Sequence, residues 1–305
     1  MLRLETGLLD LLLADPQAAF QPLDHPALHR LEEDVNTFGS AERIPPVDQV
    51  RDRHKLEEYY SYPSFLEFRD DVAELAQRFK DLSEGGLLTA VSHLFEPDPE
   101  PLEIHLLPIG HTMGDAYVRE IDGRPVICVN LAVVARFYGQ SNDERWQDLV
   151  PVLEHEVFHV YFARERARSR YWQDFLGALT PLREAQLILL DEGIGHFIGH
   201  RANIARYLAE RRETLQKVLT DCWQALERLA DPSLATAEAR EIILRGTVGE
   251  FFTKYLSIAG MLGAYALFSV GGFPALRRCL EDLACFHTEG MARVERLLTP
   301  PLKDA

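Results

Sequence analysis

The chain has 305 residues, which is enough for one large domain or two smaller ones. Hydrophobic residues make up 47% and charged residues 26%, which is typical of soluble globular proteins and excludes a disordered, collagen-like or disulfide-dependent chain. Acidic residues outnumber basic residues by 48 to 32, and the formal net charge of −16 argues against nucleic acid as a partner.

The sequence contains no uninterrupted apolar stretch close to the roughly 20 residues that cross a bilayer, so no membrane span is predicted. The four cysteines form no CxxC pair, which argues against a zinc–thiolate or redox motif. Their spacing is typical of reduced cysteines in a cytoplasmic protein.

The N-terminal portion, residues 1–95, is predicted to be mostly helical. An amphipathic helix is expected over Gly7–Asp15, because Asp10 interrupts what would otherwise resemble a signal peptide. A second helix is expected over Ser64–Leu82, where apolar residues recur at helical spacing. The proline-rich run at 96–101 is predicted to end this portion.

The second region, residues 96–305, begins with a small sheet predicted over 102–131. A hairpin turn is expected at Asp122-Gly123, a dipeptide that favours two-residue turns. Helices are predicted over 141–212 and 214–298, starting with a capping box at Ser141-x-x-Glu144. Pro151 is expected to kink the first helix or make it restart near Asp148. The fold class is therefore α+β and mainly helical.

The segment most informative about chemistry is the HExxH motif formed by His155, Glu156 and His159. Residues four apart on a helix point the same way, so both imidazoles can reach one metal ion. Glu156 stands beside them, where it can act on a water molecule as general base. The surrounding residues are strongly apolar, and buried polar groups need partners. A metal site explains the motif better than a purely structural helix does.

The third ligand separates the HExxH families. The metzincin pattern fails, because Phe162 and Glu165 stand where that pattern needs glycine and histidine. The other common arrangement takes a glutamate from a later helix and leaves one coordination position open.

Glu192 is the favoured third ligand, because it interrupts an apolar helix. The Gly193 that follows it allows another backbone to approach closely. Glu184 is a weaker candidate, since it belongs to an exposed first helical turn where the helix dipole favours a carboxylate. Asp191 is a second alternative, either as a ligand or as a group that orients a ligand imidazole.

His155-Glu156-x-x-His159 followed by Asp191-Glu192-Gly193 resembles the gluzincin metallopeptidases, whose best-known members are thermolysin and aminopeptidase N. The sequence is also similar to bacterial families of uncharacterised zinc-dependent peptidases, in which a glycine-bearing helix follows the glutamate helix, as Gly260–Ala264 does here. The resemblance is specific over 141–200 and weak over 250–290, and it does not extend to 1–95. It implies a thermolysin-like catalytic core with Zn²⁺ bound by His155, His159 and Glu192.

The implied function is hydrolysis of peptide bonds in a peptide or protein substrate, with Glu156 as general base. Candidates for stabilising the oxyanion are His196, one turn after Glu192, together with Tyr255 and Tyr265. Two alternatives remain open: a non-catalytic zinc-containing binding or regulatory protein, and a hydrolase of a non-peptide amide. The intact Glu156 favours catalysis. The resemblance also implies a sheet edge facing the zinc, predicted around Thr112–Val118.

Overall fold

A computed structural model describes residues 1–21, 23–38, 43–82, 84–89, 91–112 and 114–298. Contacts within the chain group it into two compact units. Unit 1 contains residues 1–89 and 97–160, and unit 2 contains residues 90–96 and 161–305. The predicted boundary near residue 95 does not separate these units, because the N-terminal portion and the sheet share unit 1.

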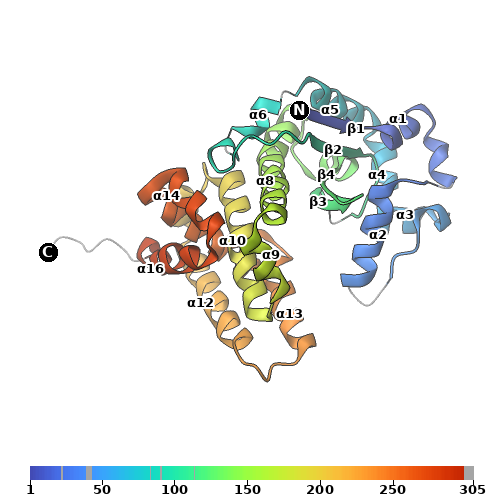
Figure 1. Ribbon diagram of the computed structural model, residues 1–305. Coiled ribbons are helices and arrows are strands. Elements are labelled where there is room, and N and C mark those ends of the chain that lie inside the picture. The colour runs from blue at the N-terminus through green and yellow to red at the C-terminus, as the bar shows by residue number, and fades with distance from the viewer. Residues whose placement is uncertain (22, 39–42, 83, 90, 113, 299–305) are drawn as a thin grey trace. The chain divides into compact units, whose positions relative to one another are not determined.

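The centre of unit 1 is a four-stranded mixed sheet, which confirms the α+β class (Figure 1). Its strands lie in the order β1-β2-β4-β3. β1 pairs parallel with β2, β2 pairs parallel with β4, and β3 pairs antiparallel with β4. The strands are β1 (Leu2–Glu5), β2 (Leu102–Leu107), β3 (Ala116–Ile121) and β4 (Arg124–Asn130).

Strand β1 was not expected, because residues 1–95 were predicted to be mostly helical. It has only four residues and runs directly into a helix, so it offers too few positions for an alternating pattern to be visible. The β3–β4 hairpin was predicted and is confirmed. Asp122 and Gly123 both have positive φ, 51° and 73°, as a type I′ turn requires.

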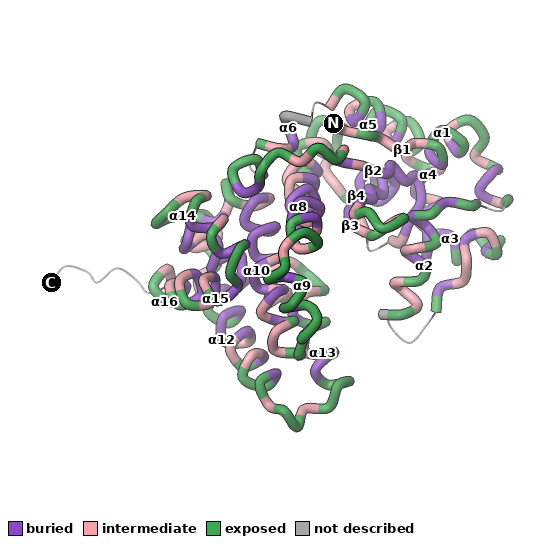
Figure 2. Tube along the Cα trace, in the orientation of Figure 1, coloured by how far each residue is buried: buried purple, intermediate pink, exposed green. Residues whose placement is uncertain are grey.

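Helices surround the sheet in unit 1, and β2 and β4 are largely buried (Figure 2). The expected helices at the N-terminus and over Ser64–Leu82 are present, the second divided in two at Phe68. The helices are α1 (Gly7–Ala14), α2 (Pro26–Phe38), α3 (Arg53–Tyr60), α4 (Tyr62–Glu67), α5 (Arg69–Asp81), α6 (Glu84–Leu88), α7 (Leu131–Phe137) and α8 (Asn142–Arg168), whose last residues belong to unit 2.

Helix α8 begins with the capping box that the sequence predicts. The Ser141 hydroxyl accepts from the Glu144 N–H at 3.3 Å, and the Glu144 carboxylate accepts from the Ser141 N–H at 3.3 Å. The helix continues through Pro151 as one element, so of the two expected outcomes the restart near Asp148 does not occur. A proline in a helix removes one backbone donor, and the rest of this 27-residue helix keeps it continuous.

Unit 2 is helical throughout its described residues, as predicted for the chain after Ser141. Gly272 has non-helical backbone angles and divides α14 just before Pro274. The helices are α9 (Arg170–Gly177), α10 (Pro181–His200), α11 (Ile204–Glu210), α12 (Arg212–Leu229), α13 (Thr236–Thr247), α14 (Tyr255–Glu281), α15 (Leu283–Cys285) and α16 (Ala292–Leu298), with short 3-10 turns at Val91–His93 and Phe251–Thr253 and a π-helical turn at Phe286–Met291.

The expectation that no apolar stretch approaches the length of a membrane span is wrong for α14, which within the described residues is the one helix long and apolar enough to cross a membrane by length and composition. Its most apolar window is 61% buried inside the protein, which is also typical of a core helix. The break at Gly272 leaves a regular segment of residues 255–271, about 26 Å long at 1.5 Å per residue. That is slightly shorter than a bilayer core of about 30 Å.

The core of unit 2 is organised around a close crossing of α10 and α14 at two glycines. A Cβ placed on Gly193 would lie 2.5 Å from the carbonyl carbon of Gly260. A Cβ placed on Gly260 would lie 2.0 Å from the carbonyl oxygen of Leu189. The expectation that Gly193 permits close approach of another backbone is confirmed, and its partner is the glycine-bearing later helix.

We expect Gly193→Ala to lower the free energy of unfolding by about 3 kcal/mol, because overpacking against backbone cannot be relieved by a side-chain rotation. Gly177→Ala is the matched control, since a Cβ there meets nothing within 4 Å. Thermal and urea unfolding of both variants measure the difference. Equal unfolding midpoints for the two variants would contradict the close crossing.

Candidate functional site

The two motif histidines lie on one half-buried face of α8 in unit 1. Their Nε2 atoms are 2.7 Å apart, and their ring centroids are 4.6 Å apart. Leu153, Val157 and Phe158, by contrast, are buried in the core of the protein. The apolar side of the helix therefore anchors it and leaves the imidazoles side by side. Two nitrogens that converge in this way can bind one cation.

Glu156 is buried, with 8% of its surface exposed, on the same helix as the two histidines. Its charge acts on two neighbours, because it helps to raise the pKa of both Cys128 and Tyr138. For Cys128 the largest cause is burial, and the pKa rises to about 12. A buried carboxylate of this kind lies beside the two imidazoles in the sequence of the motif helix.

Tyr138 and Asp115 form a pair in unit 1 that the sequence analysis did not identify. The Tyr138 hydroxyl donates a hydrogen bond to the Asp115 carboxylate. Burial, followed by the negative charge of Asp115, raises the pKa of Tyr138 far above its usual range. The two residues are 23 positions apart and neither belongs to a motif, so no signal in the sequence pointed to this pair.

Strand β3 lies at the edge of the sheet, as predicted for the stretch around Thr112–Val118, of which Met113 lies outside the described residues. The Asn130 N–H donates to the Asp115 carbonyl at 2.8 Å. Because hydrogen-bonded pairs alternate along an antiparallel ladder, the backbone groups of Val118 and Glu120 point away from β4. Pro125, which has no N–H, accordingly lies opposite Glu120.

Glu192 and His196 lie one turn apart on α10 in unit 2. His196 is buried, and its Nδ1 is 2.9 Å from the Glu192 carbonyl oxygen, so Nδ1 carries the hydrogen in the neutral ring. The same nitrogen is 3.5 Å from the Glu192 carboxylate, whose side chain is 34% exposed. His196 thus holds the backbone and carboxylate of Glu192 in place.

Asp191 and Glu184, the two alternatives to Glu192 as third metal ligand, lie in different surroundings. Asp191 forms an ion pair with Arg166 of α8 at 3.0 Å, and both side chains are mostly buried. The guanidinium of Arg166 also lies over the Phe162 ring, 4.7 Å from its centroid. Glu184 is exposed in the first turn of α10, as expected.

Tyr255 opens α14, and its hydroxyl donates a hydrogen bond to the Ile242 carbonyl oxygen. Its only hydroxyl hydrogen is therefore engaged with α13. Burial is the largest cause that raises the pKa of Tyr255 above its usual value. This contact weakens the case for Tyr255 as an oxyanion donor and favours a role in packing α13 against α14.

Comparison with protein-family models, with curated proteins and with solved structures finds no match for this chain. The gluzincin resemblance therefore rests on the residues of the motif.

We expect Tyr138→Phe to lower the free energy of unfolding by about 1–2 kcal/mol at pH 7, because the Asp115 carboxylate loses a buried hydrogen bond. The raised pKa keeps the phenol protonated in the folded state, whereas the unfolded chain ionises near pH 10. The difference between the unfolding free energies of the wild type and the variant should therefore shrink as pH rises above about 10. Urea unfolding between pH 7 and 11 measures this difference. A difference that stays constant over this range would contradict the hydrogen bond from Tyr138 to Asp115.

Proposed function

We propose that this protein is a zinc-dependent peptidase with a gluzincin-type, thermolysin-like catalytic core. In this proposal His155, His159 and Glu192 bind one Zn²⁺ ion, and Glu156 is the general base. The observation that carries it is the pair of converging imidazoles on α8 beside a buried glutamate. Two imidazoles and one carboxylate are a common ligand set of catalytic zinc, which retains an open coordination position.

Continuity along α8 supports Glu192 over the other carboxylates. Arg166 follows His159 by seven residues, or two helical turns, on the same uninterrupted helix. It forms an ion pair with Asp191, the residue directly before Glu192. This ion pair within unit 2 occupies the Asp191 carboxylate. Asp191 thus fits a positioning role better than a role as ligand.

When bound, zinc supplies a Lewis acid that polarises the scissile carbonyl and lowers the pKa of a coordinated water. Glu156 accepts a proton from the attacking water and passes it to the leaving amine.

A donor for the developing oxyanion is still required. His196 suits this role better than Tyr255, whose hydroxyl hydrogen is used on Ile242. In the neutral ring the His196 hydrogen is on Nδ1 and points to the Glu192 carbonyl. Donation from Nε2 therefore requires the imidazolium form of His196.

We expect His155→Ala to contain about one zinc fewer per chain than the wild type, because one of three protein ligands is lost. His54→Ala is the matched control, since His54 is an exposed histidine on α3. Elemental analysis of purified proteins measures the difference. A His155→Ala protein with undiminished zinc content would rule out the site.

The same set of proteins tests the base. Glu156→Gln keeps the shape of the side chain but cannot accept a proton, so zinc content should persist while turnover falls at least about 100-fold. Pools of fluorescence-quenched peptides supply the substrate. If Glu156→Gln retains wild-type turnover on a pool that the wild type cleaves, Glu156 is not the base.

Substrate is proposed to bind along the open edge of β3 by backbone pairing, as an extended peptide does when it adds a strand to a sheet. Val118→Pro removes a backbone donor that points away from β4, and proline is tolerated at such an edge position. We expect KM to rise severalfold at unchanged zinc content. Glu120→Ala keeps all backbone groups and is the control. Equal KM values for both variants would place substrate elsewhere.

A further inference from the structure

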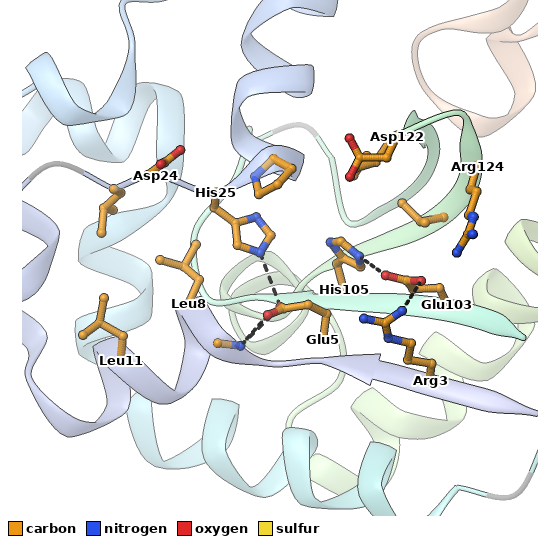
Figure 3. A pocket seen from close by; sticks show the side chains of 15 residues that line it. Arg3, Glu5, Leu8, Leu11, Asp24, His25, Glu103, His105, Asp122 and Arg124 are labelled. Atoms are coloured by element: carbon orange, nitrogen blue, oxygen red, sulfur yellow. Dashed lines mark hydrogen bonds and ion pairs between the residues drawn. The ribbon is translucent and has the colours of Figure 1, made fainter.

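A second cluster of potential metal ligands lies in unit 1, outside the HExxH motif. Glu5 ends β1, His25 directly precedes α2, and His105 lies on β2 directly opposite Glu5 in the parallel register. One nitrogen of each imidazole and one carboxylate oxygen all lie within 4.8 Å of one another. Figure 3 shows the three side chains gathered at one wall of a hollow.

His105 has the arrangement that metal-binding histidines commonly have. It is 4% exposed, and its Nε2 lies 2.9 Å from a carboxylate oxygen of Glu103. Glu103 in turn forms an ion pair with Arg3 at 3.5 Å. An ionised carboxylate can only accept, so Nε2 carries the hydrogen and the lone pair is on Nδ1. A ligand imidazole usually donates its other N–H to a carboxylate in this way.

The Nδ1 atom of His105 is buried and has no hydrogen-bond partner among the described residues. Buried polar atoms in proteins nearly always have one, so an orphaned acceptor needs an explanation. A cation bound between His105, His25 and Glu5 would provide the missing partner.

Glu5 and His25 are held at a separation that suits metal coordination. The Glu5 oxygens accept from the Gly7 N–H at 3.0 and 3.2 Å, which fixes the carboxylate at the start of α1. His25 Nε2 lies 3.3 Å from a Glu5 oxygen. Two ligands at about 2.0 Å from a tetrahedral zinc ion are also about 3.3 Å apart.

The chemistry of His25 is compatible with a cation. Burial is the largest cause that lowers its pKa, which favours the neutral ring that metals bind. Without a cation Nδ1 accepts from the Ala27 N–H at 3.3 Å, so the ring hydrogen is on Nε2 and points to Glu5. Binding at Nε2 moves that hydrogen to Nδ1 and gives up the Ala27 contact, which is a weak hydrogen bond at this length.

The hollow beside the cluster has a volume of about 740 Å³ and is open to solvent. Its wall combines the three candidate ligands with apolar side chains such as Leu8 and Leu23. Three protein ligands leave at least one coordination position for water or a small ligand entering from this hollow.

We propose that Glu5, His25 and His105 form a second metal site, specific for a divalent transition-metal ion such as Zn²⁺. The ion joins β1, β2 and the segment before α2, three parts of unit 1 that are distant in the sequence. Its binding therefore stabilises the N-terminal part of the chain. The site is independent of the proposed peptidase centre.

The test uses the full chain carrying His155→Ala and His159→Ala, so that zinc binding by the motif is removed. Calorimetric titration with ZnCl₂ should give about one bound ion per chain, and excess zinc should raise the thermal midpoint. Adding His105→Ala should weaken zinc binding at least tenfold and abolish the thermal shift. Adding His54→Ala, at an exposed histidine of the same unit, should change neither.

Glu5→Gln guards against loss of folding in the His105 variant. It keeps an oxygen for the Gly7 N–H but loses the charge that a cation requires, so zinc binding should again weaken at least tenfold. Circular dichroism confirms that each variant is folded, and Co²⁺ absorption reports coordination by imidazole and carboxylate. Absence of zinc binding in the double variant overturns the proposal. So does zinc binding that Glu5→Gln and His105→Ala leave unchanged.

Discussion

The α10–α14 crossing determines what unit 2 can present to a ligand. Backbone atoms meet there without intervening side chains, at Gly193 on one helix and Gly260 on the other. A contact of this kind fixes both the separation of two helices and their rotation, because any larger residue at the crossing would force them apart. Glu192 directly precedes the crossing and His196 follows it by three residues. The orientation of the proposed ligand is thus set by main-chain packing rather than by a flexible loop.

In unit 1 the corresponding constraint is the parallel pairing of β1 with β2. Four residues at the N-terminus complete the sheet and place Glu5 beside His105. The same strand ends where α1 begins, and the Glu5 carboxylate accepts from the Gly7 N–H there. The position of the Glu5 carboxylate is therefore set by the strand that it ends, by the Gly7 N–H at the start of α1 and by the neighbouring histidines. This accounts for the close grouping of ligand atoms without any sequence motif.

Local features of the fold could be predicted from the sequence because local chemistry decides them. The Asp122-Gly123 turn, the capping box of α8 and the glycine at the helix crossing each follow from backbone sterics at one or two residues. β1 could not be predicted, since its stability comes from β2, about 100 residues later. The sequence left two outcomes open at Pro151 for a related reason, because tertiary packing can outweigh the loss of one hydrogen bond and keep α8 continuous.

The candidate sites also include residues that the sequence predicts from local spacing and residues that only long-range contacts bring together. His155, Glu156 and His159 were found because a helix repeats every 3.6 residues, so spacing alone predicts a shared face. The Arg166–Asp191 and Tyr138–Asp115 pairs join residues 25 and 23 positions apart, and the Glu5 cluster joins residues up to 100 apart. No periodicity encodes such distances. These groups can be recognised only when the backbone has been placed.

Both proposed sites contain a polar side chain that is buried in the protein. A buried imidazole or carboxylate loses its hydration, and a hydrophobic residue of similar size usually packs at least as well. Glu156 is 8% exposed and His105 is 4% exposed. The buried Nδ1 of His105 has no hydrogen-bond partner among the described residues, so a bound cation is the simpler explanation for this side chain. In the two proposals, Glu156 acts on a water molecule as general base, and His105 holds a cation together with Glu5 and His25.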